Sequence, residues 1–330
     1  MRRPKINLAL QGGGAHGAFT WGVLDRLLQE PELRIGCISA ASAGAVNAVA
    51  LAAGLIDGGQ EGARARLATV WDAVLKAQVP DFMRGVARIS MTQILSLFSP
   101  YEFNPLGFDP LRTLLTEHID FDRIRDAAPF ELLISATEVA TGRARLFRRH
   151  EMTVDAVLAS ACLPTIHHAM KIEGVAYWDG GFSANPDLVT LAGEGHAEDT
   201  LIVLLNAIDN GATPTRPREI AAQVNALTFN MPLMRDVGQI AQIRSMSRLG
   251  LWRAPAAWRK IRRHRFHAIS AEAHTRELPA TSKAEPDAET FALLKEAGRQ
   301  EAQAWLIRHA DDLGRRSSWD LGMLLGRLDP

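Results

Sequence analysis

Short apolar runs alternate with segments of helical spacing over roughly the first 208 residues. Residues 6–11, "INLALQ", and residues 34–40, "RIGCISA", have the apolar pattern of short strands. Residues 18–30 carry apolar side chains at helical spacing, and the alanine-rich segment after Ser42 is typical of a helix. Each of these two strands is therefore predicted to lead through a tight turn into a helix.

The same alternation continues to residue 207. Residues 130–141 and 143–149 are predicted to be two strands of a hairpin, and residues 153–166 a helix that stops near Pro164. Residues 175–186 indicate a strand that enters a Gly-Gly turn, and residues 200–207 have the strongly apolar pattern of a strand buried on both faces. This order predicts a layered α/β sheet covered by helices on both sides.

Two segments fit this alternation less well. Residues 80–121 interleave large apolar side chains with prolines, a pattern that suits either a lid or ordinary core helices. Residues 211–330 shift toward alanine, arginine and methionine in helical patterns, interrupted by the strand-like residues 265–270. We expect residues 211–330 to form a mostly helical extension packed on the main domain.

Charge and cysteine content narrow the class of protein. Lysine plus arginine and aspartate plus glutamate both number 37, so the net charge is zero and nothing favours a nucleic-acid partner. Cys37 and Cys162 lie in apolar or small-residue runs, which is typical of buried thiols in a reducing compartment. No apolar run is long enough to span a membrane, so we expect a soluble or at most peripheral protein, and together with the reduced thiols this favours the cytoplasm. Residues 252–266 mix two tryptophans with six basic side chains, which suits either peripheral contact with a lipid surface or a solvated basic face.

The glycine run "GGGAHG" is the first candidate for chemistry. Gly12, Gly14 and Gly17 satisfy the dinucleotide fingerprint G-x-G-x-x-G between a strand and a helix. That function also needs an acidic residue after the next strand, where this chain has "SAASAG". The amides of such a loop can instead form a cradle for negative charge, such as the oxyanion formed during ester hydrolysis.

The second candidate is Ser42 within "ASAG". A nucleophile elbow places its serine on a sharp strand-to-helix turn, with small residues two positions before and two after. Ala40 and Gly44 are both small, although the consensus has glycine at the first of these positions. The alternative for Ser42 is an ordinary helix N-cap.

The third candidate is Asp179, which ends a strand and is followed by Gly180 and Gly181. The two glycines leave space for its carboxylate to project and accept a proton. The alternative is a simple Asp-Gly turn. The conjunction of a glycine-rich loop, a serine elbow and a strand-end Asp-Gly-Gly favours catalysis over three unrelated turns.

In this order and with these residues, the chain resembles the patatin-like phospholipases over roughly residues 6–207. The resemblance rests on "GGGAHG", "SAASAG", "AVLASACLPTI" and "YWDGGFSANP". It implies a three-layer α/β fold with a central, mostly parallel sheet flanked by helices, and a lipid acyl-ester hydrolase without metal or cofactor. It also implies Ser42 as nucleophile, Asp179 as base and the backbone amides of Gly12, Gly13, Gly14 and Ala15 as an oxyanion hole. The residues that would support these motifs are His16, Gly17, Ala40, Gly44, Gly180 and Gly181.

Three positions depart from the pattern of that family. Gln11 replaces an acidic residue before the glycine run, His16 replaces an arginine or lysine within it, and Ala40 replaces a glycine. These departures leave open a non-catalytic lipid-binding or regulatory protein. A Rossmann oxidoreductase is disfavoured by the missing acidic residue, and a histidine-containing triad has less support than the Ser-Asp pair.

Overall fold

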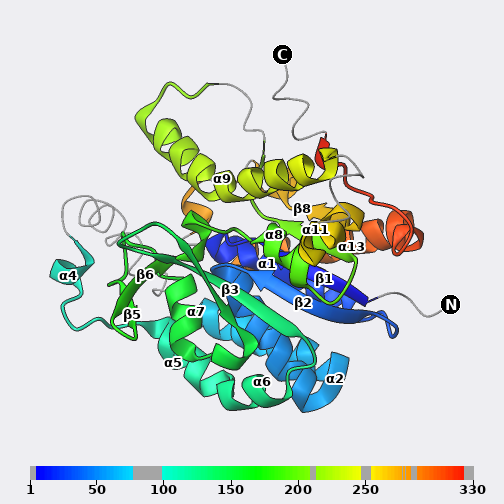
Figure 1. Ribbon diagram of the computed structural model, residues 1–330. Helices are drawn as coiled ribbons and strands as arrows, with labels where there is room; N and C mark the ends of the chain where they lie inside the picture. Colours follow the sequence, from blue (N-terminus) through cyan, green and yellow to red (C-terminus); the bar gives the residue numbers. More distant parts are fainter. Residues whose placement is uncertain are drawn as a thin grey trace.

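The computed structural model describes residues 5–76, 99–208, 213–246, 254–276, 278, 280–283 and 288–322. An eight-stranded sheet runs through this part of the chain (Figure 1). Its strands are β1 (Lys5–Leu10), β2 (Arg34–Ala40), β3 (Glu131–Glu138), β4 (Ala144–Arg148), β5 (Met170–Ile172), β6 (Val175–Asp179), β7 (Asp199–Leu204) and β8 (Arg265–Ser270). In space they follow the order β5-β6-β3-β2-β1-β7-β8, and β4 pairs with β3 beside this path.

The centre of the sheet is parallel. β1 pairs in parallel with β2 and β7, β2 with β3, and β7 with β8. β4 and β6 run antiparallel to β3, and β5 runs antiparallel to β6. Parallel strands bring their carboxyl ends to one edge, so the loops after β1, β2 and β7 meet there. β6 joins them because its last residue, Asp179, pairs with Ala136 on β3.

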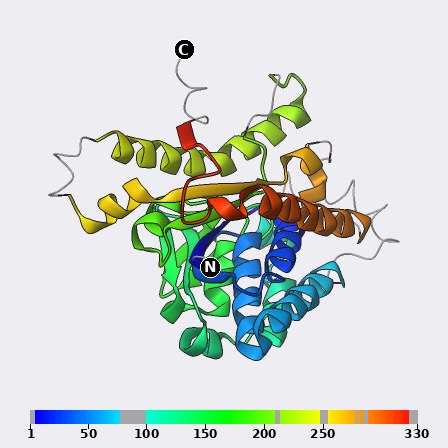
Figure 2. The same cartoon turned by 90° about the vertical axis from the view of Figure 1, so that its right-hand side faces the viewer.

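Helices cover both faces of the sheet. One side holds α1 (Gly17–Leu27), α2 (Ala43–Lys76), α5 (Pro110–His118), α6 (Phe121–Ala127), α7 (Val154–Ser160) and α13 (Ala288–His309). The other side holds α8 (Leu188–Glu194), α9 (Pro217–Ser245) and α11 (Ala256–Arg263). Figures 1 and 2 show α2 and α9 on opposite sides of the sheet. The shorter helices are η1 (Gly14–His16), α4 (Pro100–Phe103), η2 (Arg149–Glu151), η3 (Gly180–Phe182), α12 (Glu272–Thr275), η4 (Ala280–Lys283) and η5 (Ala310–Asp312).

The apolar pattern of β7 explains why helices pack on both faces of the sheet. Leu201 and Val203 pack into the core beneath α1 and α2, whereas Ile202 and Leu204 pack toward α8 and α9. Side chains alternate between the faces of a strand, so a continuously apolar strand requires helices on both sides. The fold class predicted from the sequence is thereby confirmed.

The C-terminal part of the chain is tied into this sheet. Residues 265–270 form a strand, as their pattern predicts, and that strand extends the central sheet beside β7. α13 packs against α1 near the glycine run. The division into residues 6–207 and 211–330 stays a prediction, but the extension supplies a strand of the central sheet.

Some elements differ from their predicted bounds. The helix predicted over residues 153–166 ends at Ser160, because the chain turns there toward Asp179, whose N–H donates to the carbonyl of Cys162 (2.8 Å). Of the segment 80–121, residues 80–98 lie outside the described residues, while Leu114 and Leu115 on α5 are buried core residues.

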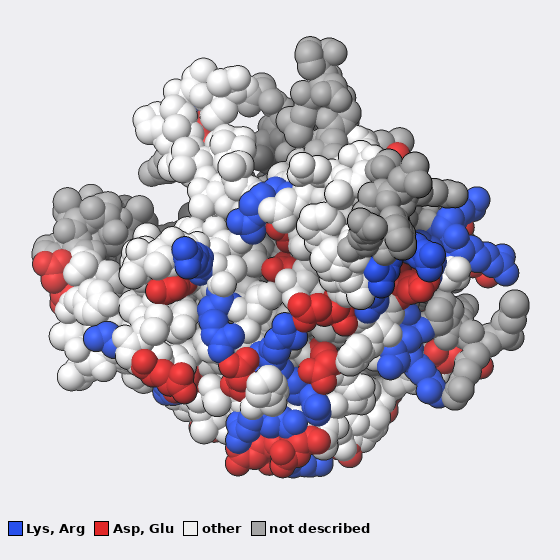
Figure 3. Space-filling model, in the orientation of Figure 1, with Lys and Arg blue, Asp and Glu red and all other residues white. Residues whose placement is uncertain are grey.

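Within the described residues, none of the helices combines the length and the apolar composition that a membrane crossing requires. Basic and acidic side chains are interspersed over the lower part of the surface in Figure 3.

Candidate active site

Ser42 lies on a sharp turn between β2 and α2. Its φ of 53° is in the left-handed region, which residues other than glycine rarely adopt and which costs about 1–3 kcal/mol. α2 begins at the next residue, so the positive end of the helix dipole faces the serine. The Ser42 N–H donates to Ser160 Oγ at the end of α7 (2.9 Å). The backbone at Ser42 is therefore that of a strained elbow, held by a buried hydroxyl.

Close packing around the elbow explains its small residues. A Cβ atom at Gly44 would lie 2.4 Å from the carbonyl oxygen of Leu10, so α2 can begin this close to β1 only with glycine there. A Cβ atom at Gly12 would lie 2.8 Å from Ser42 Cβ, so the glycine run crosses directly over the serine. Ala40, the departure from the elbow consensus, is fully buried and pairs with Leu10 and with β3. The sheet thus accommodates its methyl group.

Asp179 is fully buried at the end of β6. Its main chain is anchored through its N–H, bonded to Cys162, and its carbonyl, which accepts from Thr137 Oγ1 (2.7 Å). Its carboxylate Oδ1 accepts from the Gly181 N–H (2.7 Å), and a Cβ atom at Gly180 would lie 2.1 Å from the carbonyl of Ser135. Gly180 is therefore required for the close approach to β3. Glycine at position 181 is required because a Cβ atom there would lie 2.4 Å from Phe229 Cε1.

Burial raises the pKa of the Asp179 carboxyl to about 7, because a buried carboxylate loses its hydration. The Gly181 N–H and the Ser42 hydroxyl act in the opposite direction and lower this pKa, but burial is the larger effect. Asp179 Oδ2 has no hydrogen bond of normal geometry to any described residue. Oδ2 is therefore the carboxylate oxygen that is available to take up a proton.

The glycine run offers several backbone amides beside Ser42. The Gly12 N–H donates to Asn185 Oδ1 (2.7 Å), so it is already engaged. In the described part of the chain, the N–H groups of Gly13, Gly14 and Ala15 donate to no protein acceptor. These three amides are the ones available to a negatively charged group.

His16 and Gly17 support the loop from its far end. His16 is buried, and burial is the main reason why its pKa falls to about 4. Its Nε2 lies 2.8 Å from Ser282 Oγ rather than beside Ser42, so it forms no triad with the serine. Gly17 begins α1, where a Cβ atom would lie 2.7 Å from Ala43 Cβ.

Two residues with direct contacts to the site were given no role in the sequence analysis. Ser160 accepts from the Ser42 N–H, and Asn185 accepts from the Gly12 N–H. Both stand in the segments "AVLASACLPTI" and "YWDGGFSANP", but partners so distant along the chain leave no local spacing to detect. Their contacts show why these segments accompany the serine and the aspartate.

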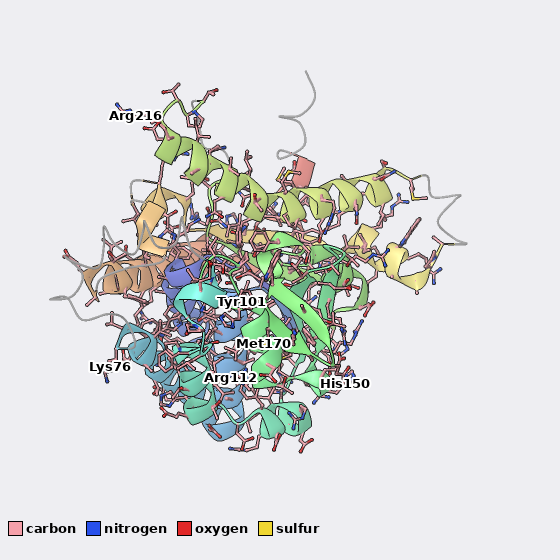
Figure 4. The ribbon with its side chains drawn as sticks, turned by 90° about the vertical axis from the view of Figure 1, so that its left-hand side faces the viewer. Lys76, Tyr101, Arg112, His150, Met170 and Arg216 are labelled. Atoms are coloured by element: carbon pink, nitrogen blue, oxygen red, sulfur yellow. The ribbon has the colours of Figure 1, made fainter. Side chains whose placement is uncertain are left out.

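A cavity of about 150 Å³ lies next to the Asp179 side of the site. Cys162, whose carbonyl holds the Asp179 N–H, is part of its lining, together with Phe108, Leu158 and His167. Tyr101 stacks on His168, another lining residue, with 4.2 Å between ring centroids. Figure 4 looks onto this side of the molecule, with Tyr101, Met170 and Arg112 one below the other.

The residues described provide no metal site: no three histidine, cysteine, aspartate or glutamate side chains cluster in a way that could hold an ion. The loop after β2 carries Ser42 where a dinucleotide site would need a carboxylate for the ribose. Among its functional groups the site therefore has a hydroxyl, a carboxylate and free amides, which suit acyl transfer.

Comparison with known proteins agrees with this geometry. The sequence profile of patatin-like phospholipases matches residues 8–191, more than half of the chain. A search of curated proteins gives no match. Among solved structures, VipD from Legionella pneumophila is similar with 12% identity over 93% of this chain and 67% of that one, at a TM-score of 0.43. The ExoU-SpcU complex of Pseudomonas aeruginosa is similar with 17% identity, 99% and 75% coverage and a TM-score of 0.35. Structural similarity at TM-scores this low does not support an inference about function, so the family assignment rests on the sequence profile.

The buried carboxylate predicts a pH-dependent gain of stability in Asp179→Asn. The Asp179 pKa lies above its unfolded value, so wild type loses about 1.4 kcal/mol of stability per pH unit between about pH 4 and pH 7, and the loss levels off above pH 7. The asparagine avoids this loss and keeps an acceptor for the Gly181 N–H. Urea unfolding at pH 5 and pH 8 should therefore show a larger gain at pH 8. Asp72→Asn, at an exposed position on α2, is the matched control. An equal difference at both pH values would contradict the raised pKa.

Proposed function

Because this chain belongs to the patatin-like phospholipase family, we propose that it hydrolyses lipid acyl esters with Ser42 as nucleophile and Asp179 as general base. The observation that carries this proposal is the meeting of a strained serine elbow with a fully buried carboxylate whose pKa is about 7. An ordinary helix N-cap would not explain the strained backbone of Ser42. A simple Asp-Gly turn would not explain the complete burial of Asp179. We extend the proposal to the oxyanion donors and to the surface that meets lipid.

In the first step, Ser42 Oγ attacks the ester carbonyl carbon while its proton moves to Asp179 Oδ2. A carboxylate with a pKa near 7 is a better base than an exposed aspartate, and about half of it is ionised at pH 7. The carbonyl oxygen becomes an oxyanion. When the tetrahedral intermediate collapses, the alcohol leaves with the proton from Asp179 and the acyl group stays on Ser42.

In the second step, water attacks the acyl group on Ser42 and gives its proton to Asp179. The second tetrahedral intermediate releases the fatty acid, and Ser42 Oγ recovers its proton from Asp179. A single buried carboxylate can serve both steps because it returns to its ionised form after each one.

The free amides of Gly13, Gly14 and Ala15 are our proposed oxyanion donors. Fixed amides need no reorganisation when charge develops, and each such donor typically contributes about 10²–10³-fold to the rate. Gly12, which the sequence analysis included among the donors, instead donates to Asn185 and holds the loop over Ser42.

The first half of α9 is the surface that we propose to contact lipid. Residues 220–234 contain no charged side chain, and the exposed apolar residues fall on one helical face at Ile220, Val224, Leu227 and Met231. This half of the helix projects beyond the sheet, and few of its atoms in Figure 3 are charged. An exposed apolar stripe of this kind commonly marks an interaction site.

The same helix reaches the active site, which favours α9 as the lipid contact. Phe229 packs on Phe182 at 5.0 Å between ring centroids, directly after the Asp179 turn. By contrast, the basic segment 252–266 is partly occupied with internal contacts: Lys260 donates to the carbonyl of Gly195, and Arg265 pairs with Asp199. Trp252 lies outside the described residues.

A fluorophosphonate probe tests the proposed nucleophile, because it reacts covalently with an activated serine. We expect wild type to be labelled, Ser42→Ala to lose labelling completely, and Asp179→Asn to react about 100-fold or more slowly since the base is gone. In-gel fluorescence and mass spectrometry of the labelled peptide measure this.

Ser39→Ala is the matched control, because Ser39 is a buried serine on β2, the strand that leads to Ser42, and its hydroxyl has no described partner. It should label like wild type. Folded wild type that resists the probe, or label found on another residue, would remove the basis for the proposed function.

A negative charge on the exposed apolar face of α9 should weaken contact with lipid and leave the hydrolytic reaction itself unchanged. Val224→Asp and Leu227→Asp alter exposed side chains, so folding and hydrolysis of a soluble short-chain ester should be unchanged. Hydrolysis of phospholipid vesicles should fall about 10- to 150-fold, since losing one inserted side chain removes about 1.5–3 kcal/mol of binding. Ile307→Asp, at an exposed position on α13, is the control. Equal losses on both substrates would contradict the assignment.

A further inference from the structure

Lys283 lies against the glycine run although it is far outside residues 8–191, which match the family profile. It ends η4, and its carbonyl oxygen would be 2.4 Å from a Cβ atom at Gly14. Gly14 has a φ of +57°, so both its conformation and its contact with Lys283 require glycine. The C-terminal part of the chain thus closes directly on the loop that holds the free amides.

The Lys283 ammonium is connected to the same loop through a side-chain bridge. Its Nζ donates to Asn206 Oδ1, and the Asn206 Nδ2 approaches the carbonyl of Gly12 (3.4 Å). The backbone N–H of Asn206 in turn donates to Gln11 Oε1 (3.0 Å). The lysine therefore holds the start of the glycine run from the side opposite Asn185.

No carboxylate in the described residues forms an ion pair with Lys283. Lys283 is half-buried, and this burial lowers the pKa of its ammonium. A cation withdrawn from water normally has an anionic partner. Its charge also contributes to the lowered pKa of His16, after burial, so His16 stays neutral at pH 7. The loop is thus supplied with positive charge by Lys283 and with none by His16.

Resting on the function proposed above, we propose that Lys283 is a positioning residue of the active site. It orders the glycine loop, and its positive charge strengthens the binding of a negatively charged group by the loop amides. A half-buried positive charge is screened by less water than an exposed one, so it acts more strongly on an oxyanion. Neighbouring Ser282 holds His16 at the other end of η1, so η4 fixes this loop at two points. The C-terminal extension is then a working part of the catalytic site.

The test compares Lys283→Met, which removes the charge, with Lys283→Arg, which keeps it. Rates on a neutral soluble ester are normalised to the concentration of active sites titrated with the fluorophosphonate probe, so misfolded protein does not contribute. We expect Lys283→Met to lower kcat about 10–100-fold with KM within about threefold and with an unchanged or higher Tm. Lys283→Arg should recover part of the lost kcat. Lys5→Met, an exposed lysine at the opposite end of β1, should behave like wild type.

Three results would overturn the proposal. They are an unchanged kcat in Lys283→Met, an equal loss in Lys283→Met and Lys283→Arg, and a loss confined to KM on anionic phospholipid, which would make Lys283 a head-group contact. Wild type without ester hydrolysis would instead count against the proposed function itself, so the two failures are distinguishable.

Discussion

The burial of the Asp179 carboxylate is the constraint on which the rest of the site depends. An aspartate in water would be ionised but weakly basic, whereas a buried one with a pKa of about 7 combines ionisation at neutral pH with useful basicity. The fold tolerates this unfavourable burial because it anchors the residue on both sides, at Cys162 and Thr137. In the mechanism we propose, the pair of Asp179 and Ser42 needs no histidine, and His16 is engaged with Ser282.

Close approach of backbones is the second constraint, and it follows from the first. To bring a serine on the loop after β2 beside a carboxylate at the end of β6, the chain must pass the end of β1 at van der Waals distance. Gly12 and Gly44 permit that passage, and Gly180 permits the approach of the aspartate to β3. Strain at Ser42 is tolerated because Ser160, β1 and α2 all fix its backbone. The strained backbone at Ser42 thus lowers the stability of the fold but places the serine beside the carboxylate, and such strain is common at functional sites.

Much of this arrangement was predictable from sequence because it is encoded locally. The strands around β1, β2 and β6, the turn at Ser42 and the aspartate followed by two glycines each show in a few consecutive residues. What escaped prediction depends on partners distant along the chain. Neither the engagement of the Gly12 amide by Asn185 nor the approach of Lys283 to Gly14 has a local signature. Likewise, the pattern of residues 265–270 predicts a strand but cannot say that it pairs with β7, since that depends on how the intervening helices pack.

The pH dependence of kcat/KM on a neutral soluble ester tests the central claim most directly. Protonated Asp179 cannot accept the Ser42 proton, so kcat/KM should rise about tenfold per pH unit below pH 7 and level off above it. His16, with a pKa near 4, cannot produce this limb. A profile that rises with a midpoint close to 7 is the predicted result. A rate that is flat between pH 5 and pH 9 would contradict the assignment of a buried aspartate as the catalytic base.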